Sequence, residues 1–219
     1  MIHGVDVSEW QEGVAWEKLQ PGFVIIRAGH GASWDEELGT NVQKAERLGI
    51  PWGVYWCHEN GESGYAEAVQ AMAPWSGSRY PKLGIWFDVE PDINLNAATY
   101  EAAAFCREIE RGGYYAGIYG CESVLDDLDL PEYDRWTAAW GSNNGRINES
   151  YKPKRGTMWQ YTSKLIVDGH QVDGDVCIYD DLSFYDLKPK KYKIGLLNRL
   201  VQVKAELDSI IKEVEEMSK

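Results

Sequence analysis

The chain has 219 residues, 44% of them hydrophobic, and a formal net charge of −13. This length and hydrophobic content suffice for one main domain with a short appendage. The acidic excess argues against a nucleic-acid partner, because phosphate backbones are bound through Lys and Arg. No segment approaches the length of a membrane span, and residues 2–7 predict a strand in place of the apolar core of a signal peptide, so we expect no membrane partner.

Cysteine and histidine usage gives no sign of a metal or redox centre. The four cysteines are widely spaced and lack CxxC pairs, so we expect them to be reduced. The four histidines show no metal-ligand spacing, and no P-loop, dinucleotide or serine-hydrolase motif occurs. We therefore expect neither a metal ion nor an organic cofactor.

Strand-like and helix-like segments alternate through the first half of the chain. The predicted strands there are 2–7, 23–28, 52–57, 83–88 and 114–119, and the predicted helices are 35–48, 65–73 and 96–111. After Tyr119 the helical signals fade. The remaining predicted strands, joined mainly by loops, are 136–140, 157–161 and 172–179. This order predicts an α/β barrel, TIM-like, with helices missing in its second half.

The segment Leu83 to Pro91 carries the strongest chemical signal. An apolar run leads into Asp88 and Glu90, which lie two residues apart and therefore point to one side of a strand. Apolar neighbours and mutual repulsion are expected to raise the pKa of one carboxyl and keep it protonated near neutral pH. Glycoside hydrolysis uses such a pair of acids. The alternative is that acids cluster here because a turn begins.

Further candidates have equally ordinary alternatives. Asp6 stands at the exit of the first predicted strand, where an acid can also cap a helix or turn. Ten Trp and thirteen Tyr against four Phe offer rings that stack on sugars and bond through a polar edge, although an aromatic-rich core would use them too. His58 and Glu59, after the third predicted strand, are weaker candidates for substrate contact.

Three motifs in this order resemble the glycoside hydrolase family 25 lysozymes, muramidases that cleave peptidoglycan. The motifs are DVSEWQ from Asp6, IWFDVEP from Ile85 and WQYTS from Trp159. The resemblance covers residues 1–187. It implies a flattened, irregular (β/α) barrel with an acidic groove at the carboxyl ends of its strands.

The resemblance also implies roles for single acids. Glu90 matches the family's proton donor, and Asp88 matches a partner that stabilises charge or steers the 2-acetamido group of the substrate. Asp6 matches a further groove acid. The family's last acid lies in a Val-Asp-x-Asp/Asn pattern, which is best matched by Asp173. A slip of two residues would select Asp175 instead, or a further slip even Cys177, since all three share one strand face.

Aromatic residues that the family presents to the sugar have counterparts at strand ends. The matching residues, for each of which a packing role is the alternative, are Tyr55, Tyr119, Trp140 and Tyr161. Asp175 is a further candidate for substrate binding.

The chain changes character near Leu187. Residues 188–195 form a basic, Pro-broken linker, and from Leu196 to Met217 apolar residues recur at alternating steps of four and three. This heptad seam predicts that 196–219 is a helix that joins copies of the chain into a homo-oligomer. The alternative is a helix that folds back on the barrel. Residues 188–219 carry eight Lys or Arg and five Asp or Glu, so the segment would lie well against an acidic wall.

The sequence thus predicts an endo-acting muramidase that hydrolyses the β-1,4 bond between N-acetylmuramic acid and N-acetylglucosamine in bacterial peptidoglycan. The alternatives are a chitinase-like hydrolase of another acetamido-sugar polymer and a glycan-binding barrel without catalysis. The lack of a signal peptide predicts a phage endolysin, made in the host cytoplasm and acting on the cell wall after release.

Overall fold

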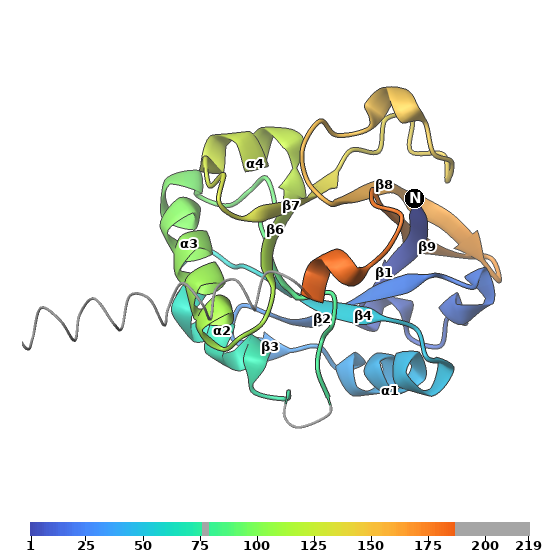
Figure 1. Cartoon of the computed structure of the whole chain (residues 1–219), viewed down its shortest axis with the longest axis horizontal. Coiled ribbons are helices and arrows are strands. Elements are labelled where there is room, and N and C mark those ends of the chain that lie inside the picture. Colours follow the sequence, from blue (N-terminus) through green and yellow to red (C-terminus); the bar gives the residue numbers. More distant parts are fainter. Residues whose placement is uncertain (76–78, 187–219) are drawn as a thin grey trace, which may run out of the picture.

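The computed structural model describes residues 1–75 and 79–186 (Figure 1). The predicted linker 188–195 and the predicted heptad helix 196–219 lie outside the described residues. Within the described ranges, no helix is long and apolar enough to cross a membrane. None of the four cysteines forms a disulfide.

Eight strands of the described chain close into a barrel. In order around the ring they are β1 (Ile2–Val7), β2 (Phe23–His30), β4 (Trp52–Cys57), β5 (Ile85–Asp88), β6 (Ala116–Cys121), β7 (Asp134–Ala138), β8 (Met158–Val167) and β9 (His170–Cys177). Neighbours from β1 to β8 are parallel, whereas β9 runs antiparallel to both β8 and β1. The short strand β3 (Ser33–Trp34) pairs with β2 beside the ring. The predicted irregular α/β barrel is therefore confirmed.

Helices cover the first half of the ring. The helices are α1 (Leu38–Leu48), α2 (Gly64–Met72), α3 (Leu95–Arg111) and α4 (Glu122–Leu128). The first three were predicted, but α4 was missed because seven residues give little periodic signal. Its Val124, Leu125 and Leu128 are buried, so packing on the barrel supplies the stability that so short a helix lacks by itself. In the described chain no α-helix follows β7 or β8, as predicted for the second half.

The hairpin of β8 and β9 extends further than predicted. Its two strands are joined by Asp168 and Gly169, both with positive φ, 50° and 82°. An Asp-Gly pair with both residues in this conformation is typical of a tight hairpin turn that matches strand twist. The Asp-Gly dipeptide was thus a sequence signal for the hairpin that the strand prediction did not use.

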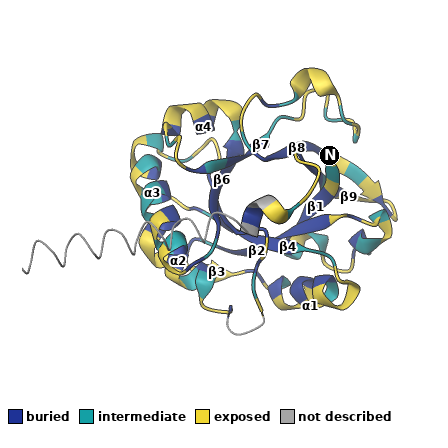
Figure 2. Cartoon of the chain, in the orientation of Figure 1, coloured by how far each residue is buried: buried dark blue, intermediate teal, exposed yellow. Residues whose placement is uncertain are grey.

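Two apolar layers follow from the alternation of side chains along the strands. Figure 2 shows the buried strands surrounded by helices with exposed outer faces. On β5, Trp86 packs inside the barrel, whereas Phe87 and Val89 pack in the outer layer beneath the helices. Asp88 and Glu90 therefore follow Trp86 onto the inner side, as the sequence predicted.

The end of the described chain closes the amino-terminal end of the barrel. The 3-10 helix η4 (Ser183–Asp186) lies across the ring in Figure 1. Its Tyr185 ring packs 4.9 Å from that of Tyr115, and its hydroxyl donates to Thr157 Oγ1 at 3.2 Å. Tyr115 stands directly before β6 and Thr157 directly before β8, so both contacts lie at the amino-terminal ends of these strands. The open end is consequently the carboxyl end, where parallel barrels place their chemistry.

Candidate active site

The open end of the barrel carries Asp88 and Glu90 at the exit of β5. Asp88 is the last residue of the strand and is buried, and Glu90 is exposed. Between them, the Val89 N–H donates to the Tyr119 carbonyl on β6, which continues the extended pairing by one residue. The two acids thus share the inner side of the mouth, one deep and one facing solvent.

Two more acids meet across β1 and β9. Asp6 and Asp173 are direct partners in the antiparallel pairing, so their side chains share one face. Asp175 pairs with Gly4, one layer deeper, and is 0% exposed. Cys177 lies deeper still, in the inner apolar cluster. The three residues that the sequence could not rank are therefore ordered by depth, with Asp173 at the level of Asp6.

The buried acids are held by a few hydrogen bonds. Gln160 Nε2 donates to Asp6 Oδ2 at 2.8 Å, and Trp136 Nε1 donates to Asp175 Oδ1 at 2.7 Å. The Asp6 and Asp175 carboxyls also lie within hydrogen-bond reach of each other. Two carboxyls can share a hydrogen bond only if one carries a proton. This end of the cluster therefore retains a proton.

Burial dominates the acid strengths here. It raises the pKa of Asp6 well above its usual range, with Asp175 as the next cause. Burial also raises the pKa of Asp173 to about 8, helped by Asp6, and that of Asp175 to about 7. Fully ionising this group would place several charges in a small, poorly solvated volume, so protons remain bound near neutral pH.

Burial also raises the pKa values of Asp88 and Glu90. Burial and then the Glu90 charge raise the pKa of Asp88 well above its usual range, while a hydrogen bond with the Cys57 thiol on β4 opposes the shift. Partial desolvation and Asp92 raise the pKa of Glu90. Asp88 Oδ1 has no hydrogen-bond partner among the described residues. The pair can hold one proton, and the exposed member can deliver it.

Gln160 on β8 is a site residue that the sequence analysis quoted in a motif but did not select. Its Oε1 accepts from Tyr119 Oη and from Trp140 Nε1, each at 2.8 Å, while its Nε2 binds Asp6. The available signal was a polar residue flanked by Trp159 and Tyr161 in a buried strand. A single amide thus joins two candidate sugar-binding aromatics to a groove acid.

A cavity of about 390 Å³ opens beside Glu90 and is lined by Tyr119 and Trp140. The Trp140 side chain is 41% exposed, so its ring is available to a ligand. Tyr55 lies half-buried, with Asp6 and Asp88 as the acids that most affect its pKa. These three predicted aromatics therefore gather at the mouth.

Tyr161, the fourth predicted aromatic, does not line the mouth. It is buried on the outer side of the barrel, where it packs with Trp159 and Val176 and approaches Gly174. Alternation along β8 explains the error, because Gln160 occupies the inner face. Tyr161 is a packing residue here.

His58 is also turned from the mouth. Its Nδ1 lies 2.8 Å from Glu67 Oε2 on α2, and its ring packs on Phe87 in the outer layer. Glu59 instead contacts His30 Nδ1 at 2.7 Å. Neither weaker candidate joins the acids.

Arg27 on β2 is a charged residue near the site that the sequence analysis missed. Its Nη2 lies 2.5 Å from Glu9 Oε1 and its Nε lies 2.7 Å from Asp35 Oδ2. The guanidinium opposes the pKa rise of both Asp88 and Tyr55. Across the part of the chain that the structure describes, no His, Cys, Asp and Glu cluster has the arrangement of a metal site.

Residues 5–170 match the family model of the glycosyl hydrolases family 25. The structure is similar to the catalytic domain of endolysin ply40 from bacteriophage P40 of Listeria monocytogenes, with a TM-score of 0.70 and 25% identity over 86% of this chain and 98% of that one. It is also similar to a family 25 glycosyl hydrolase from Bacillus anthracis (TM-score 0.69, 21% identity, 85% and 93% coverage). It is similar as well to the bacterial lysozyme from Streptomyces coelicolor, with a TM-score of 0.68 and 22% identity over 85% of this chain and 98% of that one. No curated protein matches the chain by sequence.

Proposed function

The chain belongs to the glycosyl hydrolases of family 25, and on this premise we propose that it is a muramidase of bacterial peptidoglycan. It cleaves the β-1,4 bond between N-acetylmuramic acid and N-acetylglucosamine. The observation that carries the proposal is the acid cluster at the open end of the barrel, with an aromatic-lined cavity beside Glu90. Similarity to a phage endolysin domain at 25% identity supports the substrate class.

Glu90 is the proton donor in this proposal. It is the exposed acid of the pair, and its raised pKa keeps the proton available to the departing glycosidic oxygen. Asp88 lies behind it and becomes the carboxylate that faces the positive charge developing on the sugar. The same carboxylate can orient the 2-acetamido group. Asp6 and Asp173 bind the substrate and tune the electrostatic field of the groove.

Tyr119 and Trp140 form the aromatic wall of the cavity and bind the sugar next to Glu90. Both are anchored to Gln160 Oε1, which fixes their polar edges; Trp140 is 41% exposed and its ring is available to stack on the sugar, whereas Tyr119 is buried and offers only a small exposed part to the cavity. Aromatic rings with an anchored polar edge suit a sugar, which has an apolar face and a polar rim. Tyr55 contributes a hydroxyl among the acids.

The direct test is Glu90→Gln, which keeps the shape of the side chain but carries no transferable proton. Lysis of cell walls should fall to near the limit of detection while the protein remains folded and still binds walls. Asp88→Asn should also cripple turnover, and Asp6→Asn should reduce it more mildly. Glu12→Gln, an exposed acid on another segment, is the matched control and should leave activity unchanged. Undiminished lysis by the Glu90 variant would disprove its role.

Product analysis separates this function from its two alternatives. Mass spectrometry of digested peptidoglycan should find fragments with N-acetylmuramic acid at the reducing end. Cleavage of chitin oligomers with no wall products would indicate a hydrolase of another acetamido-sugar polymer. Wall binding with no products from either polymer would indicate a non-catalytic barrel.

The domain organisation belongs to the same proposal. Residues 1–187 form the catalytic domain, 188–195 a linker, and 196–219 a helix that joins copies of the chain. The support is the heptad pattern of the sequence, since several linked barrels would bind a repetitive wall with greater avidity. We further propose that the protein is made in a host cytoplasm and reaches the wall after release, in the manner of an endolysin.

A further inference from the structure

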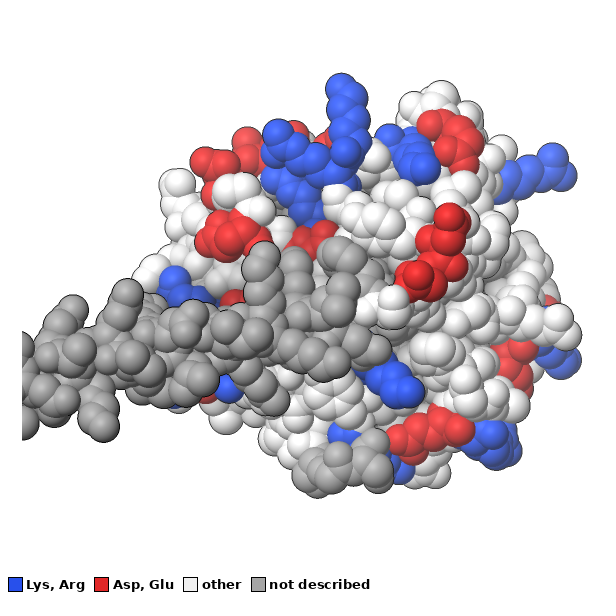
Figure 3. All heavy atoms as spheres, in the orientation of Figure 1, with Lys and Arg blue, Asp and Glu red and all other residues white. Residues whose placement is uncertain are grey.

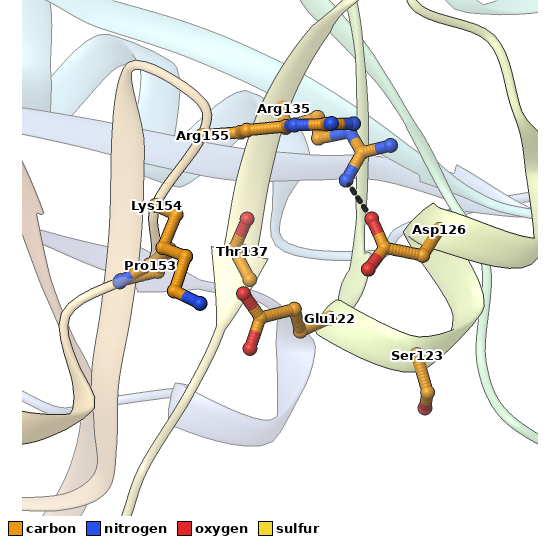
Figure 4. Close-up of a pocket in the computed structure, with 8 residues that line it drawn as sticks. All are labelled: Glu122, Ser123, Asp126, Arg135, Thr137, Pro153, Lys154 and Arg155. Carbon is orange, nitrogen blue, oxygen red and sulfur yellow. Dashed lines mark hydrogen bonds and ion pairs between the residues drawn. The ribbon is translucent and has the colours of Figure 1, made fainter.

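A second cavity, of about 500 Å³, lies on the outer side of the barrel (Figure 4). Its walls come from α4, β7 and the segment 153–155 that leads into β8. The described chain has no α-helix between β7 and β8, and the outer face of β7 is covered instead by α4 and by the segment before β8, which leave this cavity between them. This face presents Arg135 and Thr137 to the cavity, while Trp136 between them points inward.

The cavity contains one cation fixed by hydrogen bonds and two exposed cations, and all three lower the pKa of Asp126, Arg135 most. Arg135 is 8% exposed, and its guanidinium is held by Asp126 Oδ1 at 2.6 Å and by the Leu125 carbonyl at 2.8 Å. Lys154 and Arg155 are exposed and form no ion pair or hydrogen bond with any residue of the described ranges. Figure 3 shows Lys and Arg side chains gathered beside Asp and Glu side chains near α4 and β7. Two positive charges are thus available to a ligand.

The hydroxyl of Thr137 adds a further polar group to the lining. Thr137 is only 2% exposed, lines the cavity, and has no hydrogen-bond partner in the described part of the chain. The Thr137 hydroxyl is not among the buried unpaired side-chain atoms, so its exposed oxygen reaches the cavity and is available to a ligand. Glu122 and Ser123 complete this side of the cavity with a carboxylate and a further hydroxyl.

The outer cavity and the mouth share a wall. Cys121 and Ala138 line the cavity beside Glu90, and their chain neighbours Glu122 and Thr137 line the outer one. The ends of β6 and β7 therefore separate the two spaces. A molecule held by its sugar at the mouth can pass over this edge and continue into the outer cavity.

We propose that the outer cavity binds the stem peptide carried by the N-acetylmuramic acid residue at the mouth, and we call it the peptide pocket. The inference rests on the proposed muramidase function. Stem peptides are short and extended, and each residue spans about 3.3–3.6 Å, so a few residues reach across the shared wall. Their carboxylates pair with Lys154 and Arg155 and accept from the Thr137 hydroxyl. An ammonium group on the peptide pairs with Glu122.

The mixed charge of the lining favours a peptide over a polyphosphate. Three cations and two carboxylates line the pocket, which leaves a small positive excess. A phosphate polymer would meet repulsion from Glu122 and Asp126, whereas a peptide with carboxylates and an ammonium group complements both signs. The pocket would thus distinguish glycan strands with stem peptides from bare ones.

The test compares two soluble glycans with the full-length protein. One is a peptidoglycan oligosaccharide with its stem peptides, and the other is the same glycan after an amidase has removed them. Lys154→Gln combined with Arg155→Gln should lower kcat/KM for the peptide-bearing glycan about tenfold, mostly through KM, because two charge-assisted hydrogen bonds are lost. Hydrolysis of the bare glycan should stay at the native rate. Arg47→Gln combined with Lys82→Gln removes the same charge from exposed sites outside this cavity and should change neither rate.

The possible outcomes distinguish a failure of the peptide pocket from a failure of the proposed muramidase function. If the native protein cleaves both glycans equally well and the Lys154 and Arg155 variant matches it, the peptide pocket is wrong and the muramidase stands. If the native protein cleaves neither glycan, the proposed function itself fails. Equal losses on both glycans would reveal a general structural effect and overturn the inference. Inhibition by inorganic phosphate at constant ionic strength, equal to that by free stem peptide, would show a general anion site instead.

Discussion

Gln160 Nε2 donates to Asp6 Oδ2 at 2.8 Å, across the barrel between residues 154 positions apart in the chain. The same side chain accepts from Tyr119 and Trp140 through Oε1. With both ends of the amide engaged, its orientation is set by the network. Gln160 is therefore placed to hold a groove acid and the aromatic wall of the cavity in one fixed arrangement.

Replacing Gln160 should separate positioning from proton transfer. Gln160→Met keeps the volume but removes the donor to Asp6 and the acceptor for the two aromatics. We expect kcat/KM to fall about tenfold to a hundredfold, since each lost bond leaves a buried polar group unpaired at a cost of about 1–3 kcal/mol. Gln160→Glu retains the acceptor for the two aromatics but not the donor to Asp6. Compared with the Met variant, it should bring KM closer to the native value, while kcat recovers less. Native kinetics for the Met variant would exclude a positioning role.

The two acids of β9 should differ in activity assays. Asp173→Asn removes a charge at the level of Asp6 and should reduce turnover severalfold. Asp175→Asn should have a smaller effect, because an amide at this depth can still accept from Trp136 and donate to Asp6. Steady-state kinetics of the two variants on one soluble glycan decide the order. A silent Asp173 variant beside an impaired Asp175 variant would reverse the assignment of the last groove acid.

Activity should follow a bell-shaped pH profile with its maximum on the mildly acidic side. The rate falls at high pH as the Asp88 and Glu90 pair loses its shared proton, and it falls at low pH as the pair takes up a second one; burial raises the pKa of both acids and so moves both limbs above the range of free carboxyls. The measurement is kcat/KM on a soluble glycan over about pH 4 to 9 at constant ionic strength. A rate that continued to climb above neutral pH would contradict a carboxylic acid as proton donor.

Stability should decrease as the pH rises through neutrality, and Asp175 should account for part of the change. Its pKa is 3.8 ordinarily and about 7 in the folded protein. Between these values the folded state retains a proton that the unfolded state releases, so the free energy of unfolding falls as pH increases. Asp175→Asn should remove this part of the dependence, leaving the part due to the other buried acids, and gain on the order of 2 kcal/mol relative to the native protein above neutral pH. Urea unfolding at pH 5 and pH 8 measures it, and an unchanged difference between the two pH values would refute the assignment.

The full chain should form a dimer or a higher assembly in light scattering. A version ending at Leu187 retains Tyr185, which packs inside the barrel, and should be monomeric. The shortened protein should hydrolyse soluble fragments at the native rate but lyse whole cells more slowly, because avidity is lost. Equal monomeric masses for both versions would eliminate the oligomerisation helix.

Local periodicity in the sequence determined most of the secondary structure and the central acid pair. Strands β1 and β4 have the predicted bounds, and α3 begins within one residue of its prediction. Asp88 and Glu90 lie on the inner side because alternation along a strand depends only on spacing. The family followed from three motifs of adjacent residues, and the family model matches residues 5–170, which contain all three.

Other features depend on which strands become neighbours, and only the tertiary structure decided them. The depth of Asp173 and Asp175 follows from the pairing of β9 with β1, and a shift of two residues would leave the local pattern unchanged. Tyr161 lies on the outer side because Gln160 occupies the inner face of β8. The hydrogen-bond partners of Gln160 that fix this choice include Asp6 and Tyr119, which are far away in the chain. The peptide pocket exists because α4, the outer face of β7 and residues 153–155 meet without filling the space between them. Such contacts join distant segments, so no local pattern of residues encodes them.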